Sequence, residues 1–198
     1  MNRRLGSLVA LVGLLVAAAC SGGETRETLA PAEGGGRVEL VTLGGSETSG
    51  ADLDFPAVVR DRWTQRLYRD ALPTRAVHVN LDQSERLVHD GVDAQLPLAL
   101  RAKPTIATVW FGPDDEAVDT PIESFTVDLE AVIRGLMDSG AEVFVATETG
   151  TRYDQGIDTI VSAEGATPVP VTDLSDPLGP AGHADAAERF GAAIGEVS

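Results

Sequence analysis

Short apolar runs alternate with longer amphipathic segments over most of this chain, and this alternation constrains the fold more than any other feature. The apolar runs are rich in β-branched residues and are predicted to be strands at Val38–Leu43, Ala76–Asn80, Thr105–Phe111, Glu142–Thr147 and Thr167–Val171. The amphipathic segments are predicted to be helices at Phe55–Ala71, Ser84–Leu96, Ile122–Ser139, Tyr153–Ala163 and His183–Val197. Strands that alternate with helices predict a parallel sheet covered by helices on both faces. Pro168 and Pro170 each remove a backbone donor, so the last strand is expected at an edge of the sheet.

The N-terminus has the layout of a secretory signal. Two arginines precede the apolar run Leu5–Ala19, which is short for a membrane span. The run ends at Ala17-Ala18-Ala19-Cys20, which resembles a bacterial lipobox, a signal in which the cysteine is acylated and becomes the mature N-terminus. The alternative is an ordinary cleaved signal that ends near a cysteine. We expect residues 1–20 to be a lipoprotein signal, with Cys20 as the site of lipid attachment.

One globular domain is predicted after this signal. Residues 21–36 are rich in Gly, Glu and Thr and are expected to form a flexible linker. Residues 37–198 are long enough to bury a sizeable core. The protein is therefore predicted to be exported and held by lipid at the bacterial cell membrane, on the extracytoplasmic side.

The charge of the chain excludes several classes of partner. It carries 15 lysines and arginines against 31 aspartates and glutamates, a formal charge of −16, and such a surface repels nucleic acid and anionic lipid. Cys20 is the only cysteine, so no disulfide can form within the chain. His78, His89 and His183 lie far apart in sequence without metal-ligand spacing, and we expect neither a metal nor a cofactor. The partner is expected to be a small molecule or a component of the cell envelope, and the pattern specifies neither its identity nor an oligomeric state.

A serine follows the first predicted strand at the point where open α/β folds bind ligands. The strand runs into Gly44-Gly45-Ser46, which puts the hydroxyl of Ser46 at the carboxyl edge of the sheet. A glycine before the serine permits a tight turn that exposes the side chain, as in the nucleophile elbow of serine hydrolases. The alternative is that Ser46 caps the helix that follows.

Four segments in order resemble the conserved blocks of the SGNH/GDSL hydrolase family. They are Leu43-Gly44-Gly45-Ser46; Asn80-Leu81 with Ser84; Trp110-Phe111-Gly112 with Asp115; and Ala181-Gly182-His183-Ala184. The resemblance covers nearly all of residues 37–198. It implies an α/β flavodoxin-like three-layer sandwich with a five-stranded parallel sheet, an esterase or acyl hydrolase ancestry, and Ser46 at the position of the nucleophile.

The chain departs from this family at the residues that carry the chemistry. The glycine that donates a backbone N–H to the oxyanion falls on Glu85, and the asparagine that donates from its side chain falls on Asp114. We expect both donors to be lost, because a carboxylate repels a developing oxyanion. The Asp-x-x-His block yields no histidine, since counting from Asp176 places a glycine at the base and counting back from His183 places a proline there. A serine without a base is a poor nucleophile, so the resemblance implies a degenerate member.

Acidic residues follow every predicted strand. They are Glu47, Asp82, Glu85, Asp114, Asp115, Glu148, Asp173 and Asp176. In a parallel sheet these carboxylates lie near one edge, where Glu47, Asp82, Glu85, Asp114 and Asp115 could bind a ligand or a cation. The alternative is that they cap the following helices.

Three functions follow from this sequence. The first is a non-catalytic, lipid-anchored binding or accessory domain, which the lost base and donors favour. The second is an active serine ester hydrolase that uses Ser46, with His183 as a replacement base and Asp176 as its partner. The alternative for His183, which the resemblance favours, is a helix-cap or packing role. The third is a cation site at the acidic edge.

Overall fold

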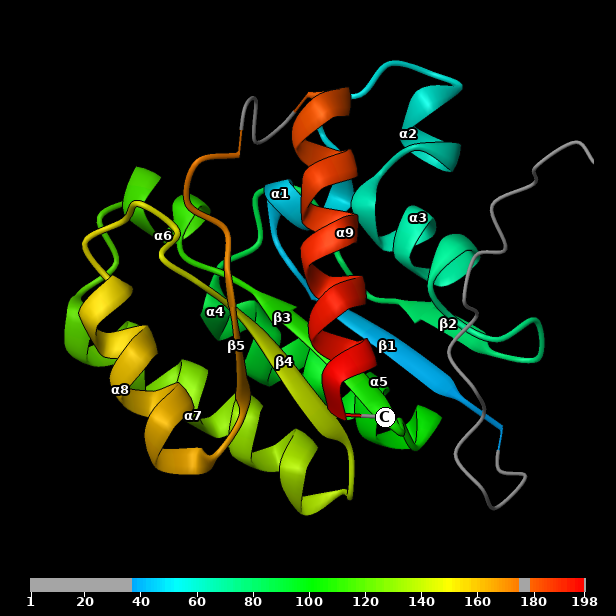
Figure 1. The fold of residues 1–198 in the computed structure, drawn as a ribbon. Coiled ribbons are helices and arrows are strands. Elements are labelled where there is room, and N and C mark those ends of the chain that lie inside the picture. Colours follow the sequence, from blue (N-terminus) through cyan, green and yellow to red (C-terminus); the bar gives the residue numbers. More distant parts are fainter. Residues whose placement is uncertain (1–36, 175–178, 198) are drawn as a thin grey trace, which may run out of the picture.

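The structure, a computed structural model, describes residues 37–174 and 179–197. Its centre is a sheet of five parallel strands in the order β2-β1-β3-β4-β5 (Figure 1). The strands are β1 (Glu39–Gly44), β2 (Val77–Asn80), β3 (Ile106–Trp110), β4 (Glu142–Thr147) and β5 (Thr167–Pro170). This strand order is the flavodoxin-like one, and the predicted fold class is confirmed. The proline-containing strand β5 lies at an edge, as expected.

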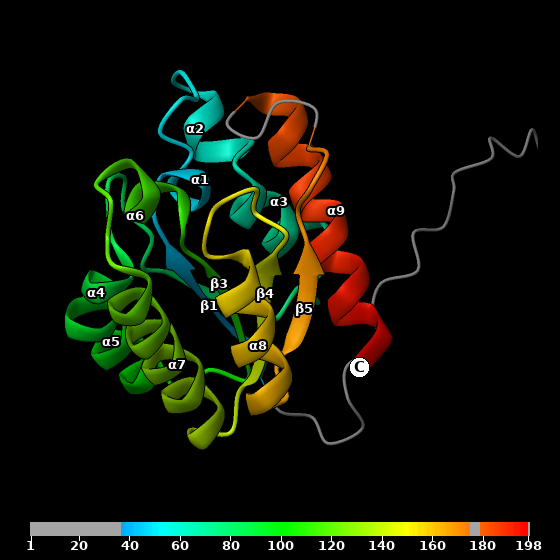
Figure 2. The same cartoon turned by 90° about the vertical axis from the view of Figure 1, so that its left-hand side faces the viewer.

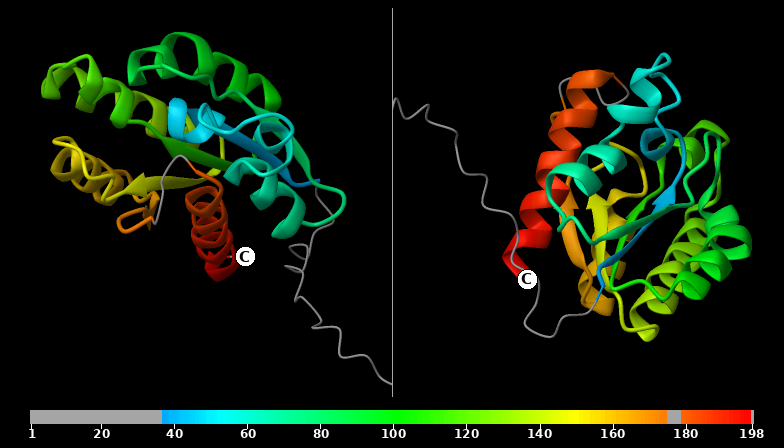
Figure 3. Two further views of the ribbon diagram at one scale, coloured as in Figure 1. Left: turned by 90° about the horizontal axis from the view of Figure 1, so that it is seen from above. Right: turned by 90° about the vertical axis from the view of Figure 1, so that its right-hand side faces the viewer.

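Helices cover both faces of the sheet (Figures 2 and 3). One face carries α3 (Trp63–Asp70) and α9 (Pro180–Val197), which pack against each other. The other face carries α4 (Val88–Asp90), the π-helical turn η1 (Gly91–Gln95), α5 (Leu96–Ala102), α7 (Ile122–Asp138) and α8 (Asp154–Glu164). Three short helices complete the described chain: α1 (Ser46–Ser49), α2 (Ala57–Arg60) and α6 (Pro113–Ala117). No helix in residues 37–174 and 179–197 is both long and apolar enough to cross a membrane.

Each face of the sheet has its own apolar core. Under α7 and α8 the core is aliphatic with a stacked pair, Phe125 and Tyr153, whose ring centroids lie 4.0 Å apart. Under α3 and α9 it is built around Trp63, which stacks on Phe190 at 4.4 Å and lies 6.0 Å from Trp110. Side chains alternate between the two cores along the fully buried β3, as a central strand of a parallel sheet requires.

Three of the predicted helices are wrong in their bounds by more than one residue. Phe55–Ala71 is not one helix, because Arg62 has an extended backbone that separates α2 from α3. Ser84–Leu96 begins later, at Val88, and continues through η1 into α5. Pro97 does not end the helix because it lies in the first turn of α5, where its missing N–H costs little.

The last helix, α9, begins at Pro180, three residues before its predicted start at His183. The short helices α1 and α6 were not predicted at all. Both lie at the carboxyl edge of the sheet, where they bring Ser46 and Asp114 together.

Candidate functional site

The Ser46 turn is held rigidly at the end of β1. The carboxamide of the buried Gln95 accepts a hydrogen bond from Gly44 N and donates one to Gly44 O, both at 3.0 Å. They hold the end of β1 beyond Thr42, where its pairing with β2 ends, and the Gly44 C=O also accepts from the N–H of Gln83 at 3.3 Å. Ser46 is the first residue of α1, so its side chain leaves the sheet edge directly.

The carboxylate of Asp114 receives two hydrogen bonds from Ser46. The Ser46 hydroxyl donates to Asp114 Oδ1 at 2.8 Å, and the Ser46 backbone N–H donates to Asp114 Oδ2 at 2.7 Å. The hydroxyl is therefore bound to a carboxylate and does not cap the helix, so the capping alternative for Ser46 is wrong. Sequence reasoning placed Asp114 at this edge but missed its direct contact with the serine.

Gly45 leaves the space that Asp114 occupies. A Cβ built on Gly45 would lie 2.1 Å from Asp114 Oδ2 and 2.8 Å from the carbonyl oxygen of Arg86. Neither distance is compatible with a side chain. The glycine before the serine therefore admits a carboxylate next to the hydroxyl, in addition to permitting the turn.

Glu85 keeps a backbone donor at the serine, so the expected loss of this donor is wrong. Its N–H donates to Ser46 Oγ at 3.0 Å. Glu85 has a φ of 60°, in the left-handed region that favours glycine. The backbone thus keeps the conformation expected of the family's glycine, while the carboxylate side chain of Glu85 is exposed.

His183 lies in the core between α9 and α3. The backbone N–H of Trp63 donates to His183 Nδ1 at 3.2 Å, and the ring is fully buried. Because Nδ1 accepts this bond, the neutral ring carries its proton on Nε2. Nε2 faces the end of α1, where a Cβ built on Gly50 would lie 3.8 Å away.

Asp176, the predicted partner of His183, lies outside the described residues, as does Cys20.

The other acidic residues have separate partners and do not converge. Asp82 lies 3.5 Å from the Arg62 guanidinium, and Asp115 Oδ2 accepts from Val88 N at 3.0 Å. Burial raises the pKa of Asp82 to about 7 and that of Asp115 to about 6. Among the described residues, no three or more His, Cys, Asp or Glu side chains are placed to hold a metal ion.

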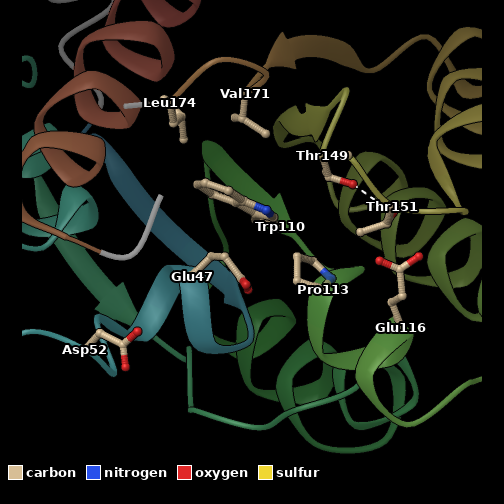
Figure 4. Close-up of a pocket in the computed structure, with 10 residues that line it drawn as sticks. Glu47, Asp52, Trp110, Pro113, Glu116, Thr149, Thr151, Val171 and Leu174 are labelled. Carbon is tan, nitrogen blue, oxygen red and sulfur yellow. Dashed lines mark hydrogen bonds between the residues drawn. The ribbon is translucent and has the colours of Figure 1, made fainter. Parts of the chain in front are cut away.

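Glu47 faces a cavity of about 410 Å³ beside the serine turn (Figure 4). Only 7% of this residue is exposed, and its Oε2 has no hydrogen-bond partner. Burial raises the pKa of Glu47 to about 7, and the negative charges of Asp114 and Asp52 raise it further in the same direction. The cavity is also lined by Asp52, Trp110, Pro113, Glu116, Thr149, Gly150, Thr151, Val171 and Leu174.

Sequence reasoning identified only Glu47 of this cavity as a ligand-binding candidate. Trp110 was noted as part of a family block, but nothing in the sequence indicated that its indole N–H has no partner. Thr149 and Thr151 follow β4 and carry no motif. Gln95 was also missed, although a glutamine between Val92 and Leu96 on a helix is a signal of a buried polar contact.

No protein-family model matches the sequence, and no curated protein is significantly similar to it. Solved structures are similar in fold. A protein described as lipolytic and of the G-D-S-L family, from Desulfitobacterium hafniense, superposes with a TM-score of 0.66 at 15% identity and covers 79% of this chain and 99% of its own. The psychrotrophic esterase EstA from Pseudoalteromonas superposes with a TM-score of 0.66 at 13% identity and covers 80% of this chain and 97% of its own.

A third similar structure is a variant of Axe2, an acetyl-xylooligosaccharide esterase from Geobacillus. It gives a TM-score of 0.64 at 13% identity and covers 79% of this chain and 94% of its own. These similarities confirm the fold that the motif resemblance implied. The chain has the SGNH/GDSL hydrolase fold.

Proposed function

We propose that this chain is a non-catalytic binding or accessory protein of the cell envelope, built on the SGNH/GDSL hydrolase fold and anchored by lipid. The observation that carries the proposal is the pair of hydrogen bonds from Ser46 to the carboxylate of Asp114, at 2.7 and 2.8 Å. This contact opposes the stabilisation of the oxyanion, and it leaves Ser46 with a carboxylate where a serine hydrolase needs a stronger base.

The first obstacle is the developing negative charge. When a serine attacks an ester, the carbonyl oxygen becomes an oxyanion and needs donors such as the N–H of the serine turn. Asp114 Oδ2 already accepts that N–H, and its own negative charge repels an oxyanion at the same place. Removing one donor from such a site typically costs about 100- to 1000-fold in rate, and a charge of the wrong sign adds to that cost.

The second obstacle is that no described residue offers Ser46 a strong base. The Nδ1 lone pair of His183 is used by the Trp63 N–H, and Nε2 carries the proton, so the ring has no lone pair to offer Ser46. The carboxylate of Asp114 does accept from the hydroxyl, but an ordinary carboxylate is a far weaker base than an alkoxide and leaves the oxygen a poor nucleophile. The alternative of an ester hydrolase that uses Ser46, His183 and Asp176 is therefore disfavoured.

The site of attachment follows from the sequence. An acylated Cys20 followed by the linker of residues 21–36 would hold the domain outside the membrane, facing the extracytoplasmic side. Because the domain is strongly acidic, lipid rather than charge would provide the attachment.

Ester turnover tests this proposal. Purified domain is incubated with p-nitrophenyl acetate and p-nitrophenyl butyrate between pH 5 and 8, beside the Ser46→Ala variant and an active GDSL esterase as positive control. We expect the wild-type rate to equal that of Ser46→Ala at every pH. A rate that disappears in Ser46→Ala would show that the protein is an esterase.

A further inference from the structure

Two buried polar groups without partners face the same cavity. The indole nitrogen of Trp110 has no hydrogen-bond partner although the residue is only 3% exposed, and Figure 4 shows it turned toward the space between Pro113 and Thr149. Glu47, which is 7% exposed, presents a carboxylate whose Oε2 is equally without a partner. A buried donor or acceptor without a partner costs stability, and a ligand that supplies the missing bond removes that cost.

The remaining polar groups of the cavity wall are acceptors. The hydroxyl of Thr149 donates its proton to Asp154 Oδ1 at 2.7 Å and lies 2.9 Å from the hydroxyl of Thr151, so these oxygens offer lone pairs to the cavity. Asp52 and Glu116 add carboxylates at the rim, and none of the described residues that line the cavity is basic.

We propose that this cavity binds a small hydroxylated ammonium compound, with the ammonium group at Glu47 and a hydroxyl oxygen accepting from the indole N–H of Trp110. This inference names a ligand class for the proposed binding function and rests on it. The excess of acceptors matches a ligand rich in N–H and O–H donors, and the single indole donor requires one acceptor on the ligand. The volume of about 410 Å³ is in the range of small-molecule sites.

Other ligand classes fit the wall less well. An anion would meet Glu47, Asp52 and Glu116 without a compensating cation. A divalent metal would need several converging carboxylates, and the described residues contain no such group. A neutral polyol could bind Trp110 but offers Glu47 no positive charge, whereas an ammonium group can pair with its carboxylate.

Three matched fragments separate these contributions. Ethanolamine carries both the ammonium and the hydroxyl group, ethylamine carries only the ammonium, and ethylene glycol carries only hydroxyls. Each is titrated into ¹⁵N-labelled protein while the two indole N–H signals are followed by NMR, since the chain has two tryptophans and Trp110→Phe assigns them. We expect ethanolamine to shift the Trp110 signal saturably, ethylamine to bind several-fold more weakly, and ethylene glycol not to bind.

Variants assign the binding to the two groups. Glu47→Gln should weaken ethanolamine binding at least about tenfold, the loss expected for a charge-assisted hydrogen bond. Trp110→Phe, in which binding is followed through the backbone amide signals of Thr149 and Thr151, should abolish the preference for ethanolamine over ethylamine. Glu142→Gln removes an exposed carboxylate on β4 outside the cavity wall and should leave binding unchanged.

The inference is overturned if no fragment shifts the Trp110 signal, if ethylene glycol binds as well as ethanolamine, or if Glu47→Gln binds as tightly as wild type. Ester turnover is measured on the same samples. If the protein shows neither ester turnover nor amine binding, only the proposed ligand class is contradicted. If it turns over esters in a way that depends on Ser46, the proposed function is contradicted, whether or not the fragments bind.

Discussion

At the scale of single residues, Asp114 determines what Ser46 can do. It accepts from both the hydroxyl and the backbone N–H of the serine, and Gly45 makes room for it because any Cβ there would collide with Oδ2. The position that the family resemblance assigns to an oxyanion donor thus holds an acceptor of opposite charge. The turn keeps the shape of a nucleophile elbow while the chemistry around the hydroxyl is reversed.

Glu47 should make the domain less stable as the pH rises. Its pKa is raised from 4.5 to about 7, chiefly by burial, so the folded protein holds a proton that the unfolded chain has lost between these values. Stability should therefore fall as the pH rises from about 4.5 through 7, by roughly 3 kcal/mol in total from this group. Glu47→Gln removes this part of the pH dependence.

Urea unfolding at pH 5 and pH 8 measures the effect. Wild type should lose roughly 2.5 kcal/mol more than Glu47→Gln between the two values. The loss that remains in the variant belongs to other buried carboxyl groups, such as Asp82 and Asp115, whose pKa values are also raised by burial. Equal losses in wild type and variant would mean that Glu47 titrates normally.

At the scale of secondary-structure elements, the π-helical turn η1 fixes the end of β1. Gln95 reaches from η1 to the N–H and the C=O of Gly44. The pairing with β2 ends at Thr42, and beyond it the N–H of Gln83 also donates to the Gly44 C=O, at 3.3 Å. Gln95→Leu should destabilise the domain by about 1–3 kcal/mol, because the buried N–H of Gly44 loses its partner while its C=O keeps the N–H of Gln83 at 3.3 Å. Thermal or urea unfolding measures this loss.

Gln83 provides a matched glutamine control. Its side chain is exposed and contacts only Arg86 among the hydrogen bonds of this loop, so Gln83→Leu should change stability by less than about 0.5 kcal/mol. If the two leucine variants were equally stable, Gln95 would not hold the turn.

The strands were predictable because each is an apolar run whose length matches one crossing of the sheet, and β5 was placed at an edge from its two prolines. The helix bounds were less predictable, because tertiary contacts override local pattern. Arg62 breaks a periodic segment so that Trp63 can donate to His183, and Glu85 delays the next helix by adopting a left-handed φ. Pro97 predicted the end of a helix, but it lies in the first turn of α5, directly after η1, where a proline is tolerated.

The candidate site was predictable in its positions but not in its pairing. The motif order located Ser46, Glu85 and Asp114 at one edge, yet which carboxylate would contact the serine depends on α1 and α6, which are too short to leave a periodic signal. The cavity beside Glu47 brings together residues from four segments of the chain, and a single sequence does not indicate which of their polar groups have hydrogen-bond partners.

For the whole molecule, the fold is that of hydrolases, whereas the proposed function is binding without catalysis. The sheet order and helix layers match those of esterases and lipolytic proteins, but a fold carries its activity only through the residues of its site. The same scale includes the N-terminal segment, whose predicted acylation would determine where the domain acts.

Replacing Cys20 tests the predicted anchor. In cells labelled with a palmitate analogue, the wild-type protein should incorporate label and sediment with membranes. The Cys20→Ala variant should do neither, because a thioether-linked lipid has no other site in a chain with one cysteine. Label retained in the variant would place the attachment elsewhere.

If Ser46 is not activated as a nucleophile, a fluorophosphonate probe should not react with it. The probe reacts with activated serines and adds a fixed mass, which intact-protein mass spectrometry detects after incubation beside an active GDSL esterase. We predict no added mass in wild type, and none in Asp114→Asn, because removing the carboxylate does not supply a base. Stoichiometric labelling of wild type that is lost in Ser46→Ala would contradict the account.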